Sequence, residues 1–282
     1  MGRVTSRRRV IRLVGPGITV RPDTLAAEEP LEIRVAGRPL TVTMRTPGHD
    51  FDLAAGFLVS EGVVRRSDEV AGIRYCAGAG DDGGNTYNVV DVVLSPGVPA
   101  PDPSLERNFY TTSSCGLCGK ASLEAVRTTA AWSVRDDPVL VNPAIVAELP
   151  DRLRAAQHVF ARTGGLHAAG LFATDGRLLC LREDVGRHNA VDKVLGWALR
   201  AERLPLRGAL LLVSGRASFE LVQKAVMAGI PVLAAVSAPS SLAADLAADA
   251  GLTLIGFLRG SSMNVYSAAH RLGIVDAALV SA

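Results

Sequence analysis

Two cysteines in a polar stretch are the residues best suited to covalent chemistry. Cys115 and Cys118 lie within NFYTTSSCGLCGKA, at positions 108–121. The apolar spacing over 121–131 suits a helix, so the pair is expected on a loop that leads into a helix N-terminus. The partial positive charge of such a terminus favours thiolate over thiol, and Lys120 adds a cation. The spacing therefore predicts sulfur chemistry.

Other uses of a CxxC pair fit this chain less well. A structural zinc site needs four ligands, but the remaining cysteines, Cys76 and Cys180, are single and far apart, and no second CxxC or HxxxH motif is present. Four cysteines do not make a secreted disulfide framework. A thioredoxin-like pair would open a helix after the first strand of a βαβ unit, and this pair comes much later. A nucleophilic or sulfur-carrying cysteine is the leading interpretation.

Composition indicates a globular protein of one large or two modest domains. The chain has 282 residues, of which 48% are hydrophobic and 21% charged, and its net charge is +2. This balance makes no case for nucleic-acid binding. Arg7–Arg9 precede an apolar run that Arg12 interrupts, which is too short for a signal peptide, and no apolar run is long enough to span a membrane. A cytoplasmic protein with free thiols is expected.

The first 107 residues predict a small α+β domain with a flexible N-terminal arm. Alternating segments at 31–35 and 40–44 indicate a hairpin, and a helix should follow at 51–61 with Asp50 as its N-cap and His49 as a turn residue. A catalytic role for His49 and Asp50 is the alternative. Two further strands are expected at 73–77 and 87–94, and four prolines within 96–103 indicate a linker. Cys76 and Cys180 fall in these and later strand-like runs and are expected to be buried apolar residues.

Residues 108–282 are expected to form the second domain, with the cysteine loop at its start. A helix is predicted at 143–162, followed by a hairpin with an Asp-Gly turn. Strands and helices then alternate, which favours a mixed, largely parallel sheet with helices on both faces, fed by the hairpin. The expected strands are 167–173, 178–182, 208–214, 231–237, 252–258 and 263–266, and the expected helices are 187–202, 217–229, 240–250 and one at the C-terminus.

Small, hydroxyl and arginine side chains follow three of the predicted strands. They occupy 214–218, 237–241 and 259–262. Ligands of such sheets bind at the carboxyl ends of the strands, and these residue types suit a phosphate. Ordinary turns and helix caps are the alternative explanation.

A charged run, REDVGRHNAVDK at 182–193, lies at a junction between a strand and a helix. His188 and Asp192 are four residues apart and would share a helix face. A functional site and a solvated helix end are both compatible with this pattern.

Six motifs in the chain resemble the FdhD family, the formate dehydrogenase accessory sulfurtransferases. They are TPGHDFDLAAGFLVSEG, NFYTTSSCGLCGK, TGGLHAAG, REDVGRHNAVDKVLG, SGRASFELVQKA and LTLIGFLRGSSMNVYS. The resemblance covers positions 31–272. It implies a cytidine-deaminase-like domain after a small α+β domain, in a cytoplasmic homodimer. The zinc ligands of true deaminases are missing from the helix starts at 187–190 and 216–219, so no zinc is expected.

The family resemblance also implies a function and its residues. A cysteine desulfurase would supply sulfur as a persulfide on Cys115. The sulfur would pass to the molybdenum or tungsten bis-guanine-dinucleotide cofactor before the cofactor enters formate dehydrogenase, and GDP should mimic that cofactor. Cys118 would be an auxiliary thiol. The residues implied to bind the cofactor are Phe257, Leu258, Arg259, Gly260, Ser261 and Ser262. A dithiol oxidoreductase and a non-catalytic cofactor chaperone are the alternatives.

Overall fold

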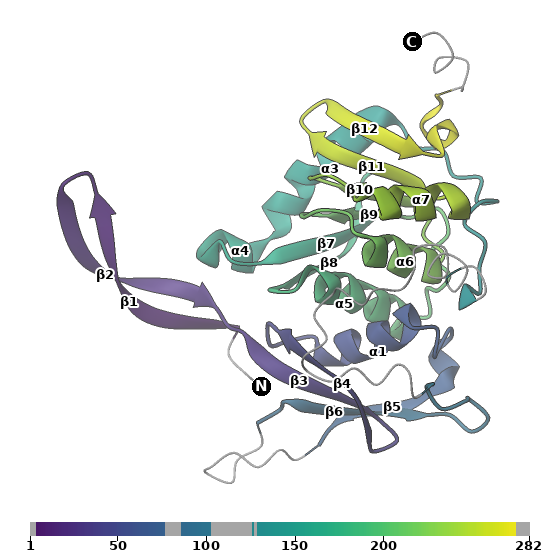
Figure 1. Cartoon of the computed structure of the whole chain (residues 1–282), viewed down its shortest axis with the longest axis horizontal. Coiled ribbons are helices and arrows are strands. Elements are labelled where there is room, and N and C mark those ends of the chain that lie inside the picture. Colours follow the sequence, from purple (N-terminus) through teal and green to yellow (C-terminus); the bar gives the residue numbers. More distant parts are fainter. Residues whose placement is uncertain (1–3, 77–85, 103–125, 127–128, 275–282) are drawn as a thin grey trace.

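The computed structural model describes residues 4–76, 86–102, 126 and 129–274. Their strands form three sheets: a two-stranded hairpin, a four-stranded sheet and a six-stranded sheet. Figure 1 shows the hairpin reaching away from the two larger sheets, which lie one above the other with helices between them.

The N-terminal arm has regular structure. β1 (Thr5–Val14) and β2 (Gly17–Ala26) pair along their whole length as an antiparallel hairpin. The sequence predicts only a flexible arm here, because arginines interrupt the alternation of apolar and polar residues that signals a strand. The base of β2 touches α4 (His158–Thr163), a helix that precedes the first strand of the larger sheet.

The small sheet matches the expected α+β unit. The predicted hairpin is confirmed as β3 (Glu29–Val35) and β4 (Arg38–Arg45), and β6 (Val89–Leu94) pairs parallel to β3. The strand order is β4-β3-β6-β5, with β5 at Val70–Tyr75. The helix α1 (Asp50–Ser60) packs between this sheet and the rest of the molecule, and a 3-10 turn at Ser67–Glu69 leads into β5.

The large sheet is mixed, as the sequence predicts. Its order is β12-β11-β10-β9-β7-β8. Only β9, β10 and β11 run parallel; β7 is antiparallel to β8 and β9, and β12 is antiparallel to β11. The hairpins β7–β8 and β11–β12, whose short connections require antiparallel pairing, supply the antiparallel part of the sheet. The strand bounds are His167–Phe172 (β7), Leu178–Asp184 (β8), Leu210–Val213 (β9), Val232–Ala235 (β10), Thr253–Arg259 (β11) and Ser262–Ser267 (β12).

Helices cover both faces of the large sheet, as expected. On one face, α5 (Arg187–Arg200), α6 (Phe219–Met227) and α7 (Ser241–Ala250) share a core with the small sheet and α1. On the other face lies α3 (Pro143–Ala156). Alternate strand residues feed the two cores: Leu211 and Leu233 face the first, while Leu210 and Val232 face the second. A 3-10 turn follows β12 at Ala269–Leu272.

The helix predicted at 143–162 is interrupted at Gln157. Two helices take its place, α3 and α4 (His158–Thr163). The Glu183 carboxylate accepts hydrogen bonds from the backbone N–H groups of Val159 and Phe160, at 2.9 and 2.7 Å. This long-range cap begins a new helix at a position that periodicity alone does not mark.

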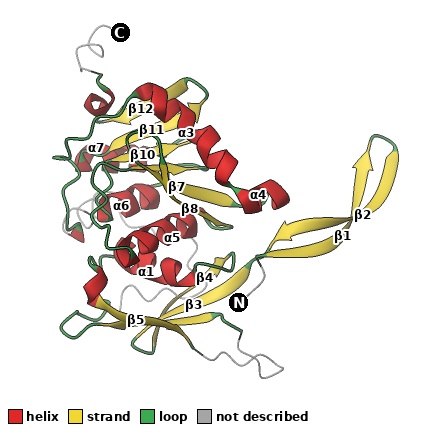
Figure 2. Ribbon diagram, turned by 180° about the vertical axis from the view of Figure 1, so that it is seen from behind, coloured by secondary structure: helices red, strands yellow, loops and turns green. Residues whose placement is uncertain are grey.

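Two glycines bring α1 and α5 into backbone contact. A Cβ atom at Gly56 would lie 1.7 Å from the carbonyl oxygen of Asp192, and one at Gly196 would lie 1.8 Å from that of Asp52. Any side chain at either position would force the helices apart. The crossing joins the small sheet to the large one, as Figure 2 shows from behind.

Candidate functional site

The two thiols predicted to carry sulfur, Cys115 and Cys118, lie outside the described residues. The other two cysteines are described. Cys180 is buried in β8, and burial raises the pKa of its thiol to about 11. It is therefore protonated at neutral pH, and the expectation of a buried apolar residue is confirmed. Cys76, which directly follows β5, is only partly buried, so the expectation of a buried residue is wrong for it.

The three loops that follow the parallel strands lie side by side, as the sequence predicts. The N–H of Ala217 donates to the Ala238 carbonyl at 3.2 Å, and the N–H of Ser237 donates to Gly215 at 3.4 Å. The N–H of Phe257 donates to the Ser237 carbonyl at 3.2 Å. These bonds tie the ends of β9, β10 and β11 into one surface, which we call the strand-end edge.

Phe257 is the unusual residue of this edge. Its φ of 50° is in the left-handed region, the pairing of β11 with β12 is interrupted between Gly256 and Arg259, and the residue is 41% exposed. A bulky non-glycine residue in that region costs on the order of 1–2 kcal/mol. The backbone turn presents the aromatic ring to solvent and turns Leu258 into the core, where it is fully buried. Of these two residues, only Phe257 offers a side chain to a ligand.

A close approach of loops supports this turn. A Cβ atom at Gly256 would lie 2.8 Å from Cδ of Pro239, in the loop after β10. Glycine therefore lets the loop after β10 pack against β11 just before Phe257.

Two arginines stand free at the strand-end edge. Arg216 follows β9, and Arg259 ends β11; both are exposed, and neither forms an ion pair with another described residue. Gly260, Ser261 and Ser262 continue the exposed turn into β12. Guanidinium groups without a carboxylate partner suit anion contacts.

Some of the hydroxyls predicted for a ligand have structural partners instead. Ser214 Oγ accepts a hydrogen bond from the Ala168 N–H at 2.9 Å, which joins β9 to β7. Ser240 caps α7 by accepting from the Ala243 N–H at 3.3 Å. For these two residues, the capping and turn alternative holds.

A histidine, a serine and a glutamate meet where α5 and α6 begin. Nε2 of His188 lies 3.0 Å from Oε2 of Glu220 and 3.3 Å from Oγ of Ser218. Ser218 also donates to Glu220 at 3.2 Å. The hydrogen bond to His188 is the main cause of the lowered pKa of the Glu220 carboxyl. The His188 side chain is thus oriented toward α6, whereas the side-chain partners of Asp192, four positions later, are Ser60 and Lys224.

A second histidine lines a cavity beside the edge. His167 begins β7, and its pKa is lowered by burial and then by the nearby charges of Arg187 and His188. The cavity has a volume of about 530 Å³ and lies between α3, α4 and the sheet. Its wall also includes Arg154, Phe160, Ser214 and Val236.

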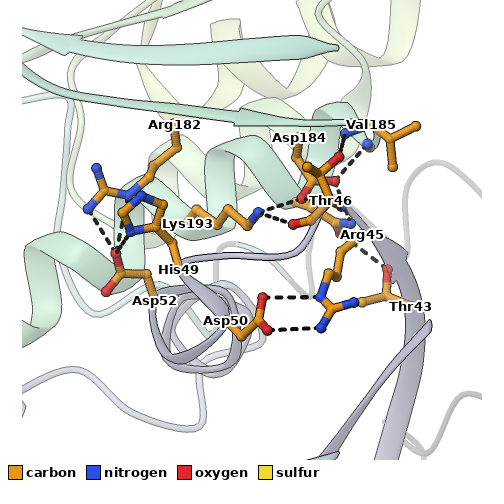
Figure 3. A network of polar contacts seen from close by, with 12 residues as sticks. Thr43, Arg45, Thr46, His49, Asp50, Asp52, Arg182, Asp184, Val185 and Lys193 are labelled. Carbon is orange, nitrogen blue, oxygen red and sulfur yellow. Dashed lines mark hydrogen bonds and ion pairs between the residues drawn. The ribbon is translucent and has the colours of Figure 1, made fainter. Parts of the chain in front are cut away.

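Two residues of the charged run at 182–193, Asp184 and Lys193, belong to a buried network that joins α5 to the small sheet. Nζ of Lys193 lies 2.6 Å from Oδ2 of Asp184 and donates to the Thr46 carbonyl at 2.8 Å. The backbone N–H of Thr46 donates to Oδ2 of Asp184 at 3.1 Å, and the Thr46 hydroxyl accepts from the backbone N–H of Val185 at 3.1 Å (Figure 3). The possibility of a solvated helix end is wrong for Asp184 and Lys193, since both are buried.

Farther along α5, Asp192 is buried against two partners from different helices. Its carboxylate binds Nζ of Lys224 at 2.7 Å and the hydroxyl of Ser60 at 2.6 Å. Asp192 therefore ties α5 to both α6 and α1.

Asp50 is not the N-cap of α1. His49 holds that position, with φ of 55° and no side-chain capping bond. Asp50 instead forms a buried bidentate pair with Arg45, at 3.1 and 2.9 Å (Figure 3). It also accepts from the hydroxyl of Tyr75, whose pKa is raised to about 12 by burial and by the Asp50 charge.

Beside this pair, Asp52 is held by two arginines. Arg182 donates to its carboxylate at 2.8 Å, and Arg200 donates to its other oxygen. His49 lies 3.7 Å from Asp52, and burial followed by the Arg182 charge lowers the pKa of its imidazole. This histidine therefore belongs to a structural cluster.

Sequence reasoning missed several members of these clusters. Glu220, Lys224 and Thr46 lie within the family motifs, but those motifs do not identify their partners His188, Asp192 and Lys193, which lie between 32 and 147 positions away. One signal was available: lysine is rare in this chain, and two of its three copies fall in apolar helical segments.

The comparisons with known proteins agree on a family. The model of the FdhD/NarQ family matches residues 26–273. The chain is 69% identical over 279 residues to "Sulfur carrier protein FdhD" of Streptomyces avermitilis, which covers 99% of both chains. It is 59% identical over 275 residues to the protein of that name in Mycobacterium tuberculosis, covering 96% of this chain and 100% of the other.

A solved structure shares the fold. The crystal structure of a "putative formate dehydrogenase accessory protein" from Desulfotalea psychrophila superimposes with a TM-score of 0.74, at 24% identity, over 96% of this chain and 100% of the other. Within the described residues, no helix is long and apolar enough to cross a bilayer. The match of the family model across most of the chain, together with relatives of this similarity, shows that the protein belongs to the FdhD/NarQ family.

Proposed function

We propose that this protein is a cytoplasmic sulfurtransferase that takes sulfur from a cysteine desulfurase as a persulfide on Cys115. It passes that sulfur to the bis-molybdopterin guanine dinucleotide cofactor of molybdenum or tungsten before the cofactor enters formate dehydrogenase. The relatives named as sulfur carriers support the sulfur step, and the name of the structural neighbour supports the enzyme served. A homodimer is the proposed working form.

The sulfur steps balance without an outside oxidant. The Cys115 thiolate attacks the terminal sulfur of the donor persulfide, an S–S bond forms on Cys115, and the donor leaves as a thiolate. Release of that sulfur as sulfide needs two electrons. Cys118 supplies them when its thiolate attacks Cys115, because the S–S bond to the terminal sulfur breaks as a disulfide forms. A thiol reductant then restores both cysteines.

The observation that carries the binding half of the proposal is the strand-end edge. The exposed ring of Phe257 offers a stacking surface for a guanine base, and Arg259 and Arg216 offer unpaired charges to phosphates. Base stacking on an aromatic side chain contributes about 1–3 kcal/mol. Leu258 would take part through its backbone alone, since its side chain is buried.

The fold order supports a further part of the proposal. The hairpin β7–β8, followed by α5, β9, α6 and β10, is the arrangement we assign to a cytidine-deaminase-like domain without its metal chemistry. The helix starts carry His188 and Ser218, which bond to Glu220. No group of three or more potential metal ligands occurs within the part of the chain that the structure describes.

Mass spectrometry after incubation with a desulfurase and cysteine tests the sulfur half. The wild type should gain one sulfur mass on Cys115, and Cys115→Ala should gain none, while Cys118→Ala should still load. Cys180→Ala is the control and should load as the wild type does. Loading of Cys115→Ala at the wild-type level would make Cys118 the carrier. A reversible disulfide couple without loading would favour an oxidoreductase, and target activation by Cys115→Ala would favour a chaperone.

Thermal stabilisation by GDP tests the nucleotide half. A ligand that binds only the native state raises the melting temperature. Arg259→Ala and Phe257→Ala should each reduce the shift, whereas Arg65→Ala, an exposed arginine of the small domain, should leave it unchanged. Equal shifts in all three variants would place the site elsewhere.

A further inference from the structure

The N-terminal hairpin exposes an apolar cluster that the proposed function does not use. Ile11, Leu13, Ile18 and Val20 are each between 58% and 70% exposed. The register pairs Ile11 with Val20 and Leu13 with Ile18. Residues directly opposite each other share a face, so the four side chains form one patch at the distal end, which we call the hairpin patch.

Among the described residues, none covers the hairpin patch. Each strand has ten residues and is about 33 Å long, and Figures 1 and 2 both show the distal half extending clear of the sheets. A two-stranded hairpin is marginally stable in water, and long apolar edge strands favour pairing with another chain. The distal half therefore has the properties of a surface that is covered in a complex.

The charge of the hairpin narrows the choice of partner. Thr5–Ala26 contains five arginines and one aspartate, which leaves 25 of the 30 basic residues and 27 of the 28 acidic residues for the rest of the chain. All five arginines are exposed, and none forms an ion pair with another described residue. They are Arg7, Arg8, Arg9, Arg12 and Arg21. A partner surface should be acidic around an apolar centre.

Three other kinds of partner fit less well. Nucleic acid would meet the arginines but leave the hairpin patch without an apolar counterpart. Lipid would leave the backbone groups of both strand edges unsatisfied in hydrocarbon, at several kcal/mol per group. A second copy of this chain offers no marked excess of acidic residues, because outside the hairpin it has 25 basic and 27 acidic residues. A different, acidic protein fits best.

The position of the hairpin indicates which protein. The base of β2 packs beside α4, and the hairpin projects from the side of the molecule where the parallel strands end (Figures 1 and 2). A protein held by the hairpin would therefore lie next to the strand-end edge. We infer that the hairpin patch and its arginines dock the apoprotein of formate dehydrogenase, as an acidic surface with an apolar centre, so that cofactor held at the edge passes a short distance. This inference rests on the proposed function.

Binding of purified, cofactor-free formate dehydrogenase to the full-length protein tests the inference by calorimetry. Ile11→Ser combined with Ile18→Ser should raise the dissociation constant by at least about tenfold. Leu140→Ser is the matched control, since Leu140 is 70% exposed elsewhere in the molecule. Arg9→Glu combined with Arg12→Glu should also weaken binding and reduce its salt dependence, while the exposed Arg207→Glu should not.

Several outcomes would overturn the inference. The inference would be wrong if both hairpin variants bound with unchanged affinity, or if the Leu140 and Arg207 controls lost as much affinity as the hairpin variants. A lower sedimentation coefficient for Ile11→Ser, Ile18→Ser alone would assign the hairpin to a second copy. Loss of binding to phosphatidylglycerol vesicles in the same variant would assign it to lipid. Sulfur loading of Cys115 and stabilisation by GDP should be unchanged throughout, so failure of docking is distinguishable from failure of the proposed function.

Discussion

The α1–α5 crossing and the strand-end edge both gather charged residues, but they treat the charges in opposite ways. At the crossing, Asp184, Lys193 and Asp192 are buried, and each is bound to a partner within 2.7 Å. At the edge, Arg216 and Arg259 are exposed and have no ion-pair partner among the described residues. Charges that stabilise the fold are paired and excluded from water, whereas exposed, unpaired charges at a loop edge are available to a ligand.

The backbone shows the same contrast. Glycine at the crossing permits contact between two helices, and the cost of any side chain there would fall on stability. At the edge, Phe257 occupies a conformation that glycine would adopt more easily, so its side chain is retained at a cost to stability. Substitutions in the two regions should therefore change the free energy of unfolding in opposite directions.

The largest effect should come from Gly56→Ala. The added methyl would overlap the Asp192 carbonyl and push α1 from α5, so the free energy of unfolding should fall by about 4 kcal/mol or more. Urea unfolding measures this change. Gly72→Ala is the control, because a Cβ there meets nothing within 4 Å, and it should change stability by less than about 0.5 kcal/mol. Similar losses in both variants would contradict the close crossing.

Lys193→Met should have the next largest effect. It leaves the buried Asp184 without its cation, and breaking a buried pair in this way costs about 3–5 kcal/mol. Arg66→Met is the comparison, because the Arg66–Asp68 pair is exposed and should contribute less than about 1 kcal/mol. If chemical denaturation gave Lys193→Met the stability of the wild type, Asp184 would not depend on this lysine.

Phe257→Gly should change stability and binding in opposite directions. Relief of the left-handed φ should raise the free energy of unfolding by about 1 kcal/mol. Loss of the ring should weaken GDP binding by about 1–3 kcal/mol. Tyr266→Gly, similarly exposed on β12, should not stabilise the protein. A Phe257→Gly protein that binds GDP as tightly as the wild type would remove the ring from the site.

The smallest effect is a pH dependence at Glu220. Its folded pKa is lowered from an ordinary value of 4.5, first by the hydrogen bond to His188. Its stabilising contribution is therefore present above about pH 4.5 and is lost as acid protonates the folded carboxylate. The difference in unfolding free energy between the wild type and Glu220→Gln should be under about 1 kcal/mol near pH 6 and should vanish toward pH 3. A difference that grows on acidification would contradict the assignment.

Local patterns predicted the elements whose signals lie within a few residues. The Asp-Gly hairpin β7–β8 and the three loops at the strand ends are where the sequence places them, because turn residues and strand periodicity are local. The break at Gln157 and the cap at His49 were not predictable in this way. The first depends on Glu183, and the second on Asp50 being drawn to Arg45.

In the candidate site, too, some residues could be identified from the sequence, whereas the roles of others depend on distant partners. Phe257 and Arg259 were identified through family resemblance, and their exposure agrees with a binding role that stays a prediction. The use of Ser214 and Ser240 as structural partners depends on which backbone groups approach them, which residue type alone does not specify. Cys115 and Cys118 stay predictions from the sequence.

The continuous core around α1 has a consequence for how the chain can be divided. Leu31 and Val90 of the small sheet belong to the same buried cluster as Leu211 and Leu254 of the large one. Neither sheet can melt without exposing the apolar face of the other, so heating should give a single calorimetric transition. Two halves of the gene expressed as separate polypeptides would each be aggregation-prone, and solubility should return only when both are made together.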